Sequence, residues 1–172
     1  MPMSEQVEAV PKEKTIYVVG VFLFLLGGVM LAPLFPNQFI SGPIVNAILL
    51  IVTVILGLRS GILMSFLPSV MALVGGLLPA IFIPFIPFIM AGNIIFVTIF
   101  HYLRQKNFWL GAGAGSVVKF IFLYISSKIM FDYFTGQTLA GAFALMMSWN
   151  QLYSAAVGSL IAFLFLKTIK RI

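Results

Sequence analysis

One long apolar run of the chain contains a lysine, the residue in this sequence with the clearest potential to bind a ligand. Lys119 lies well inside the run 108–131, too deep to be an interfacial charge. Ionisable residues at membrane depth are costly and mark functional sites by default. A lysine facing the interior of a helix bundle could bind a carboxylate, phosphate or carbonyl group of a substrate. A lysine that snorkels or pairs with an internal acceptor would instead be structural.

A second polar group is the segment from Ser148 to Ser154, with the sequence SWNQLYS. On a helix, Trp149 and Tyr153 share one face, as do Asn150 and Ser154, because residues four apart are neighbours. The aromatic pair would provide a stacking wall and the polar pair hydrogen bonds. We therefore expect a ligand pocket here, with interhelical hydrogen bonding as the alternative.

Three further polar residues extend this candidate binding set. Ser126 shares the face of Lys119 at i+7. Asn93 lies midway along the run 84–103 beside Gly92, which permits close approach of a ligand or a helix. Asn46 lies near the outer end of the run 43–58, where it either bridges helices or binds. The candidate substrate-binding residues are Asn93, Lys119, Ser126, Trp149, Asn150, Tyr153 and Asn46.

Catalytic and metal chemistry have little support in the sequence. The chain has no cysteine and one histidine, His101, which is expected on the side opposite the polar segment, so no nucleophile has a base beside it. Paired acids, histidine clusters and Walker-type phosphate loops are also missing, which disfavours zinc, haem or quinone sites and an intrinsic ATPase. We expect a binding protein that is not an enzyme, with no metal and no cofactor.

The composition of the chain indicates what kind of structure must position these residues. Of 172 residues, 62% are hydrophobic and 8% are charged, and the mean hydropathy is +1.15. Because a soluble domain has about 25% charged residues, these values indicate an integral membrane protein. At roughly 20 apolar residues per crossing, the length allows about six spans and no soluble catalytic domain.

The expected fold class is an all-α integral membrane protein, a compact bundle of six transmembrane helices. The runs do not alternate apolar and polar residues, which disfavours strands. Pro68 falls inside the third run, where we expect a kink. Residues 1–14 would form a cytoplasmic tail and 15–172 a single transmembrane domain. The predicted spans lie near 16–35, 43–58, 60–78, 84–103, 108–131 and 139–166.

Lysine and arginine are unevenly distributed between the two sets of connections. The expected outer connections contain Asp132 and no Lys or Arg. Because basic residues near span ends favour the cytoplasmic side, both termini are expected there. The formal net charge of +6 thus has a topological explanation and does not indicate a nucleic-acid partner. The basic residues on the expected inner side are Lys12, Lys14, Arg59, Arg104, Lys106, Lys167, Lys170 and Arg171.

Four local features resemble those of one transporter family. They are Ser41-Gly42-Pro43-Ile44-Val45-Asn46, the Gly57 to Gly61 hairpin, Pro84-Phe85-Ile86-Pro87 followed by Gly92-Asn93, and Trp149-Asn150-Gln151. With the length, the six expected helices and the basic C-terminal tail, they resemble S components. These are the small substrate-binding membrane subunits of energy-coupling factor (ECF) transporters.

The resemblance implies a vitamin or metal-ion binder in a prokaryotic plasma membrane that docks onto a transmembrane coupling protein and two cytoplasmic ATPase subunits. Its pocket would open outward beneath a lid formed by Phe35 to Gly42, and the last three helices would supply most of the lining. Metal-specific members have an N-terminal histidine segment that is absent here, so an organic micronutrient such as a flavin is expected. An autonomous small-solute channel or facilitator, and a membrane structural or assembly subunit, are the alternatives.

Overall fold

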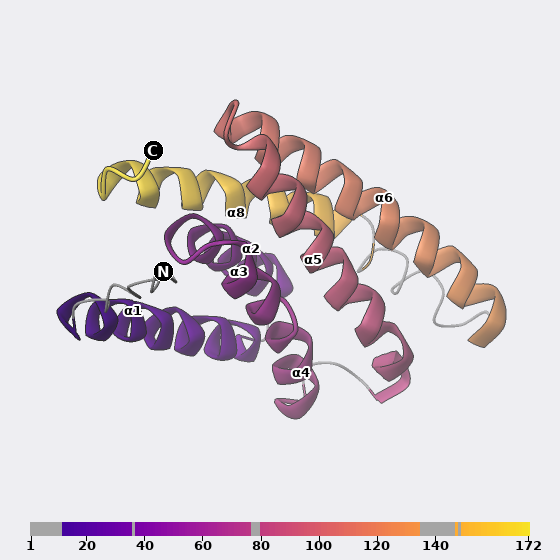
Figure 1. Ribbon diagram of the computed structural model, residues 1–172. Coiled ribbons are helices and arrows are strands. Elements are labelled where there is room, and N and C mark those ends of the chain that lie inside the picture. Colours follow the sequence, from indigo (N-terminus) through magenta and orange to yellow (C-terminus); the bar gives the residue numbers. More distant parts are fainter. Residues whose placement is uncertain (1–11, 36, 77–79, 135–146, 148) are drawn as a thin grey trace, which may run out of the picture.

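The computed structural model describes residues 12–35, 37–76, 80–134, 147 and 149–172, and every regular element in these ranges is helical (Figure 1). Short 3-10 turns, η1 (Ala32–Leu34) and η2 (Ala80–Phe85), lie between some of the helices. The helices are α1 (Lys12–Leu31), α2 (Gln38–Ile55), α3 (Leu58–Met64), α4 (Leu67–Val74), α5 (Ile86–Leu103), α6 (Phe108–Phe134) and α8 (Trp149–Thr168).

Five helical segments of the described chain are long and apolar enough to cross a bilayer. This is the pattern of an all-α, multi-pass membrane protein, as the composition predicts. The start of the last predicted span, residue 139, lies outside the described residues, and α8 is described from Trp149. The five segments are Ile16–Leu34, Gln38–Ile55, Ile83–Leu103, Phe108–Ile129 and Trp149–Thr168.

Helix α2 begins earlier than the predicted start at residue 43. Asn37 caps it, because the side-chain oxygen of Asn37 accepts a hydrogen bond from the backbone N–H of Phe39 at 2.9 Å. Pro43 therefore lies inside the helix rather than at its start. The second half of the expected lid, Gln38 to Gly42, is consequently the first part of α2 and not a loop.

The third predicted span is divided into two short helices, α3 and α4. Pro68 has no backbone N–H to donate to the carbonyl of Met64, which is four residues earlier and is the last residue of α3. The predicted kink at Pro68 is confirmed, in the form of a break. The whole segment Leu58–Val74 is shorter than the five spanning segments.

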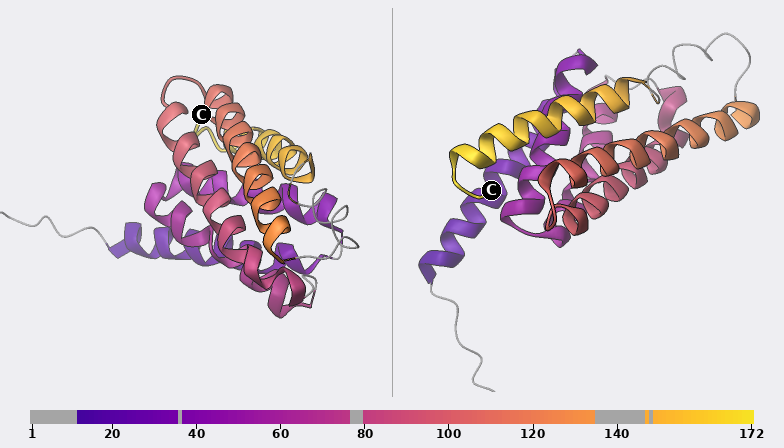
Figure 2. Two further views of the ribbon diagram at one scale, coloured as in Figure 1. Left: turned by 90° about the vertical axis from the view of Figure 1, so that its right-hand side faces the viewer. Right: turned by 90° about the horizontal axis from the view of Figure 1, so that it is seen from above.

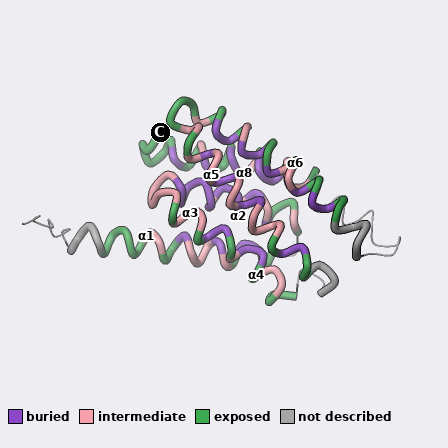
Figure 3. Tube along the Cα trace, turned by 45° about the vertical axis from the view of Figure 1, so that its right-hand side comes forward, coloured by how far each residue is buried: buried purple, intermediate pink, exposed green. Residues whose placement is uncertain are grey.

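Helix α2 occupies the centre of the bundle and α1 its edge. Helix α8 packs along α2, and α6 returns beside α5 (Figures 1 and 2). Figure 3 shows the resulting burial along the chain. In α2, Leu49, Leu50 and Val52 are fully buried, whereas many large apolar side chains of α1 are exposed.

Small residues allow α2 and α8 to approach closely. A Cβ atom added at Gly158 would lie 2.7 Å from the Cβ of Asn46 and 2.7 Å from the carbonyl oxygen of Pro43. A Cβ added at Gly42 would lie 2.8 Å from the Cβ of Ser154. Helices in lipid associate through such small-residue faces. This close packing brings the polar side chains of the two helices within hydrogen-bonding distance.

Candidate functional site

Lys119 lies at the point where several helices meet, and its side chain is 1% exposed. Its Nζ donates hydrogen bonds to Oδ1 of Asn46 at 2.7 Å and to Oδ1 of Asn93 at 2.8 Å. The ring centroid of Phe96 lies 5.3 Å from Nζ, within cation–π range. Three of the predicted site residues, from α2, α5 and α6, are therefore in direct contact.

The lysine determines how the two amide side chains are oriented. An ammonium group only donates hydrogen bonds, so each asparagine must present its oxygen to Nζ and its nitrogen elsewhere. Nδ2 of Asn46 donates to the hydroxyl of Ser154 at 3.1 Å and to the carbonyl of Gly42 at 3.0 Å. The hydroxyl of Ser154 in turn donates to the carbonyl of Gln151 at 3.0 Å. We call Lys119, Asn46, Asn93 and Ser154 the deep polar cluster.

The break between α3 and α4 supplies the remaining partner of the cluster. Nδ2 of Asn93 donates to the carbonyl oxygen of Ser65 at 3.4 Å, and Ser65 directly follows the last residue of α3. Backbone carbonyls at a break in a membrane helix need a partner from a neighbouring helix. Asn93 therefore links the break between α3 and α4 to the buried lysine.

No carboxylate is within reach of the Lys119 ammonium along its own helix. Asp132 also lies in α6, but thirteen residues further on, which is about 20 Å at the α-helical rise. The other three acids of the chain are Glu5, Glu8 and Glu13, at its N-terminal end. An ammonium has three donors, and the two amide oxygens take two of them. Among the described residues, Nζ of Lys119 is thus held by neutral oxygens and an aromatic ring.

The aromatic residues of α8 lie away from this cluster. Trp149 is 65% exposed and packs at a tilt against Phe120, with 5.4 Å between ring centroids. Tyr153 is 46% exposed and meets the edge of Phe39 at 5.7 Å. Because Ser154 faces α2, its neighbour Tyr153 is rotated about 100° around the helix axis from that face. The predicted stacking wall does not face Lys119 in this structure.

Asn150 and Ser126 complete the predicted set. Asn150 is half-buried in the first turn of α8, one turn before Ser154. Ser126 is buried two turns along α6 from Lys119, as the i+7 spacing predicts. Neither takes part in the hydrogen bonds that hold Nζ of Lys119. The structure therefore brings Asn46, Asn93 and Lys119 together. Within the described part of the chain, the other four predicted residues make no hydrogen bond to Nζ of Lys119.

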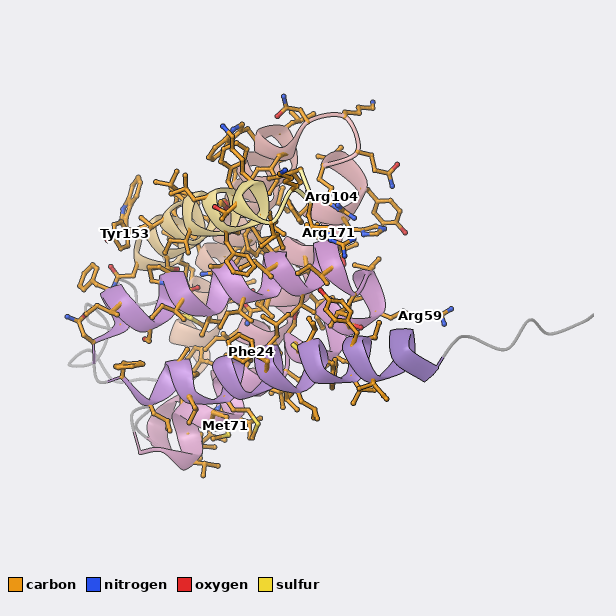
Figure 4. All side chains as sticks on the ribbon, turned by 90° about the vertical axis from the view of Figure 1, so that its left-hand side faces the viewer. Phe24, Arg59, Met71, Arg104, Tyr153 and Arg171 are labelled. Carbon is orange, nitrogen blue, oxygen red and sulfur yellow. The ribbon has the colours of Figure 1, made fainter. Side chains whose placement is uncertain are left out.

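Three arginines lie at the end of the bundle opposite Tyr153. Figure 4 shows Arg59, Arg104 and Arg171 at the end where α1 begins and Tyr153 at the other end. Burial lowers the pKa of the Arg104 guanidinium, whose Nε has no hydrogen-bond partner among the described residues. This end of the bundle is therefore the more positive one.

Sequence reasoning missed two contributors to the cluster. Phe96 is one apolar residue among many in its helix, and only its i+3 spacing from Asn93 hints that it lies near the same site. Pro68 predicts a freed carbonyl at Met64, four residues earlier, and so gives no direct signal for the carbonyl of Ser65. Which side chain would satisfy that carbonyl depends on tertiary packing.

Comparisons with known proteins identify no relative of this chain. No protein-family model matches the chain, and no curated protein or solved structure matches it. What can be inferred about function therefore comes from the sequence and from the geometry of the deep polar cluster.

Proposed function

We propose that this protein is a substrate-binding S component of an ECF-type importer. It captures an organic micronutrient from the outer side of a prokaryotic plasma membrane and delivers it through a transmembrane coupling protein and two ATPase subunits. The observation that carries this proposal is the buried Lys119 ammonium, held by neutral groups on separate helices without a carboxylate within reach along α6. Intramembrane charges of this kind are typical of substrate sites.

The chemistry of the cluster favours a ligand with an anionic or carbonyl oxygen. Such an oxygen takes the third donor of Nζ or replaces one of the two amide oxygens, each of which is less than 3 Å from Nζ. An anionic ligand would also neutralise the buried charge, which neutral amides do not. A water-soluble vitamin, including a flavin, provides oxygens of this kind.

An aromatic contact lies between the N-terminal part of α2 and the N-terminal part of α8. Phe39, from the expected lid segment, touches Tyr153, one residue before Ser154 of the cluster. In the proposed mechanism this contact opens to admit the ligand, and the rings of Tyr153 and Trp149 then turn toward it. Both rings are partly exposed, which leaves them space to move.

The charge distribution supports the proposed orientation. The end that carries Arg59, Arg104 and Arg171 (Figure 4) is assigned to the cytoplasm, because lysine and arginine near span ends favour that side. Both termini are then cytoplasmic, and α3 with α4 forms the remaining, interrupted crossing of a six-span bundle. The ATPases would then lie on the cytoplasmic side, and the coupling protein would contact them there.

Binding by the purified chain tests the proposal directly. A panel of water-soluble vitamins is titrated by calorimetry or by tryptophan fluorescence, and one member is expected to bind saturably. Lys119→Met should abolish that binding, whereas Lys128→Met should not, because Lys128 is exposed on the same helix with its Nζ over the ring of Tyr124. No saturable binding across the panel, or equal effects of the two variants, would contradict the proposal.

A structural or assembly subunit is the second candidate, and it too has a specific observation in its favour. Each polar group of the deep polar cluster already has a partner within the protein. Under this alternative, Lys119→Met changes thermal stability but no ligand is ever found. An autonomous channel is distinguished by solute flux into liposomes that contain this chain alone, which the S-component proposal excludes.

A further inference from the structure

An apolar groove lies at the basic end of the bundle, between the first part of α1 and the last turns of α8. Its volume is about 520 Å³, within the range of about 300–1,000 Å³ that small-molecule sites occupy. Five residues of α1 form one wall, Phe165 and Ile169 form the other, and Ile55 of α2 contributes. The α1 residues are Tyr17, Gly20, Val21, Phe24 and Leu25. We call this the α1–α8 groove.

A tight turn at the end of α8 places a cation in the apolar groove. The backbone N–H of Arg171 donates to the carbonyl of Leu166 at 2.9 Å, the six-to-one bond of a Schellman motif. Lys170 has φ of 55°, a left-handed conformation that helices usually reserve for glycine at this position. The turn reverses the chain, and Arg171 then lines the groove beside Tyr17.

Two properties of the groove point to its occupant. Its walls are largely apolar and include Phe24, whose side chain is largely exposed. The residues that line it and carry polar side chains are Arg171 and Tyr17, and Lys167 and Lys170 lie within the same C-terminal turns. A ligand that complements both features has a hydrocarbon chain and, at one end, a negative charge.

We propose that the α1–α8 groove binds an anionic phospholipid from the surrounding leaflet. The acyl chain lies along α1 over Gly20, the phosphate accepts hydrogen bonds from Arg171 and Tyr17, and the net negative charge of the headgroup is attracted by Lys167 and Lys170. Basic residues at a membrane surface attract anionic lipids with about 1 kcal/mol each, or roughly fivefold in affinity. This site is separate from the deep polar cluster and does not depend on the proposed transport function.

Glycine substitutions on α1 test the apolar part of the site. A Cβ atom added at Gly20 or at Gly27 meets nothing within 4 Å, so a side chain at either position starts in open space and leucine should be tolerated at both. Gly20 lines the groove and Gly27 does not. In native mass spectrometry of the full chain with dioleoyl phosphatidylglycerol, Gly20→Leu should lose the saturable lipid adduct and Gly27→Leu should keep it. Loss in both variants, or in neither, would overturn the groove as the site.

Arginine substitutions test the headgroup contact. Arg171→Gln should weaken phosphatidylglycerol binding about fivefold, and Arg59→Gln, an exposed arginine at the same end, should change it little. Dioleoyl phosphatidylcholine and free glycerol 3-phosphate should both bind more weakly than phosphatidylglycerol. Equal binding of the two phospholipids would overturn the charge argument. Light scattering provides a second check. A dimer that dissociates in the Gly20→Leu variant would also overturn the proposal, because a second copy of the chain would then cover the groove.

Discussion

Helices α1 and α2 are almost equally apolar but occupy opposite positions in the bundle. Their mean hydropathies over the spanning windows are 2.3 and 2.0, yet 22% of the first window is buried against 56% of the second. The more apolar helix is therefore the less buried one. In a bilayer, apolarity places a helix in the membrane but does not decide whether it faces lipid or protein, because lipid tails are as apolar as leucine.

Small and polar residues explain the difference. Helix α2 places Gly42 and Asn46 against α8, and its Thr53 lies against Gly61 of α3. Helix α1 also contains glycines, but a side chain added at Gly20 or Gly27 would touch nothing. A small residue therefore promotes packing only where a neighbouring helix presents a matching surface.

The largest effect is expected from Asn46 of α2. Asn46→Leu removes one of the two amide oxygens that accept hydrogen bonds from the buried Lys119, which should lower the free energy of unfolding by about 3 kcal/mol. Unfolding in mixed micelles measures the change. The double variant Asn46→Leu with Lys119→Met should recover part of the loss, because no charge is then left buried. A loss below about 1 kcal/mol in the single variant would show that the cluster contributes little to stability.

Overpacking the α2–α8 interface should have the next largest effect. At Gly158, a Cβ would lie 2.7 Å from Asn46, so Gly158→Leu should cost about 1–3 kcal/mol in the same unfolding measurement. Gly27→Leu on α1 is the matched control and should cost little, since nothing lies within 4 Å. Equal losses of unfolding free energy in the two variants would show that α1 is packed as tightly as the α2–α8 interface.

A pair of valine truncations gives a smaller effect. Val52→Ala on α2 removes two methyl groups from a fully buried position and should cost about 1 kcal/mol through the cavity left behind. Val19 of α1 is 49% exposed, so lipid can fill the space and Val19→Ala should be nearly neutral. If the two truncations lower the free energy of unfolding equally, Val19 would be packed against protein in the membrane and not against lipid.

The smallest effect is expected at Gly27 itself. Gly27→Ala adds a methyl group where nothing lies within 4 Å and restricts the unfolded chain, so it should stabilise by about 0.5–1 kcal/mol or less. The comparison is Gly42→Ala on α2, where the added methyl would press on Ser154 and destabilise. The sign of the change in midpoint unfolding temperature separates the two outcomes.

Local features of the chain were predictable from the sequence. Apolar runs placed α1, α5 and α6, because the bilayer requires about 20 apolar residues whatever the tertiary arrangement. Pro68 predicted the break between α3 and α4, since the lost hydrogen bond is a property of the residue itself. The start of α2 was placed too late because the apolar run was taken to begin at residue 43, whereas the side chain of Asn37 caps the helix earlier.

The partners of Lys119 required the tertiary structure. The sequence alone identified a deep lysine and two asparagines, but not that Asn46 and Asn93 would both direct their oxygens to it. It also did not reveal that Ser154, rather than Trp149 or Tyr153, would face this cluster. Helix formation and membrane insertion depend on local composition and hydrogen bonding. The rotation of each helix about its axis depends on the fit between small residues far apart in sequence, such as Gly158 and Asn46, and only the packed bundle determines it.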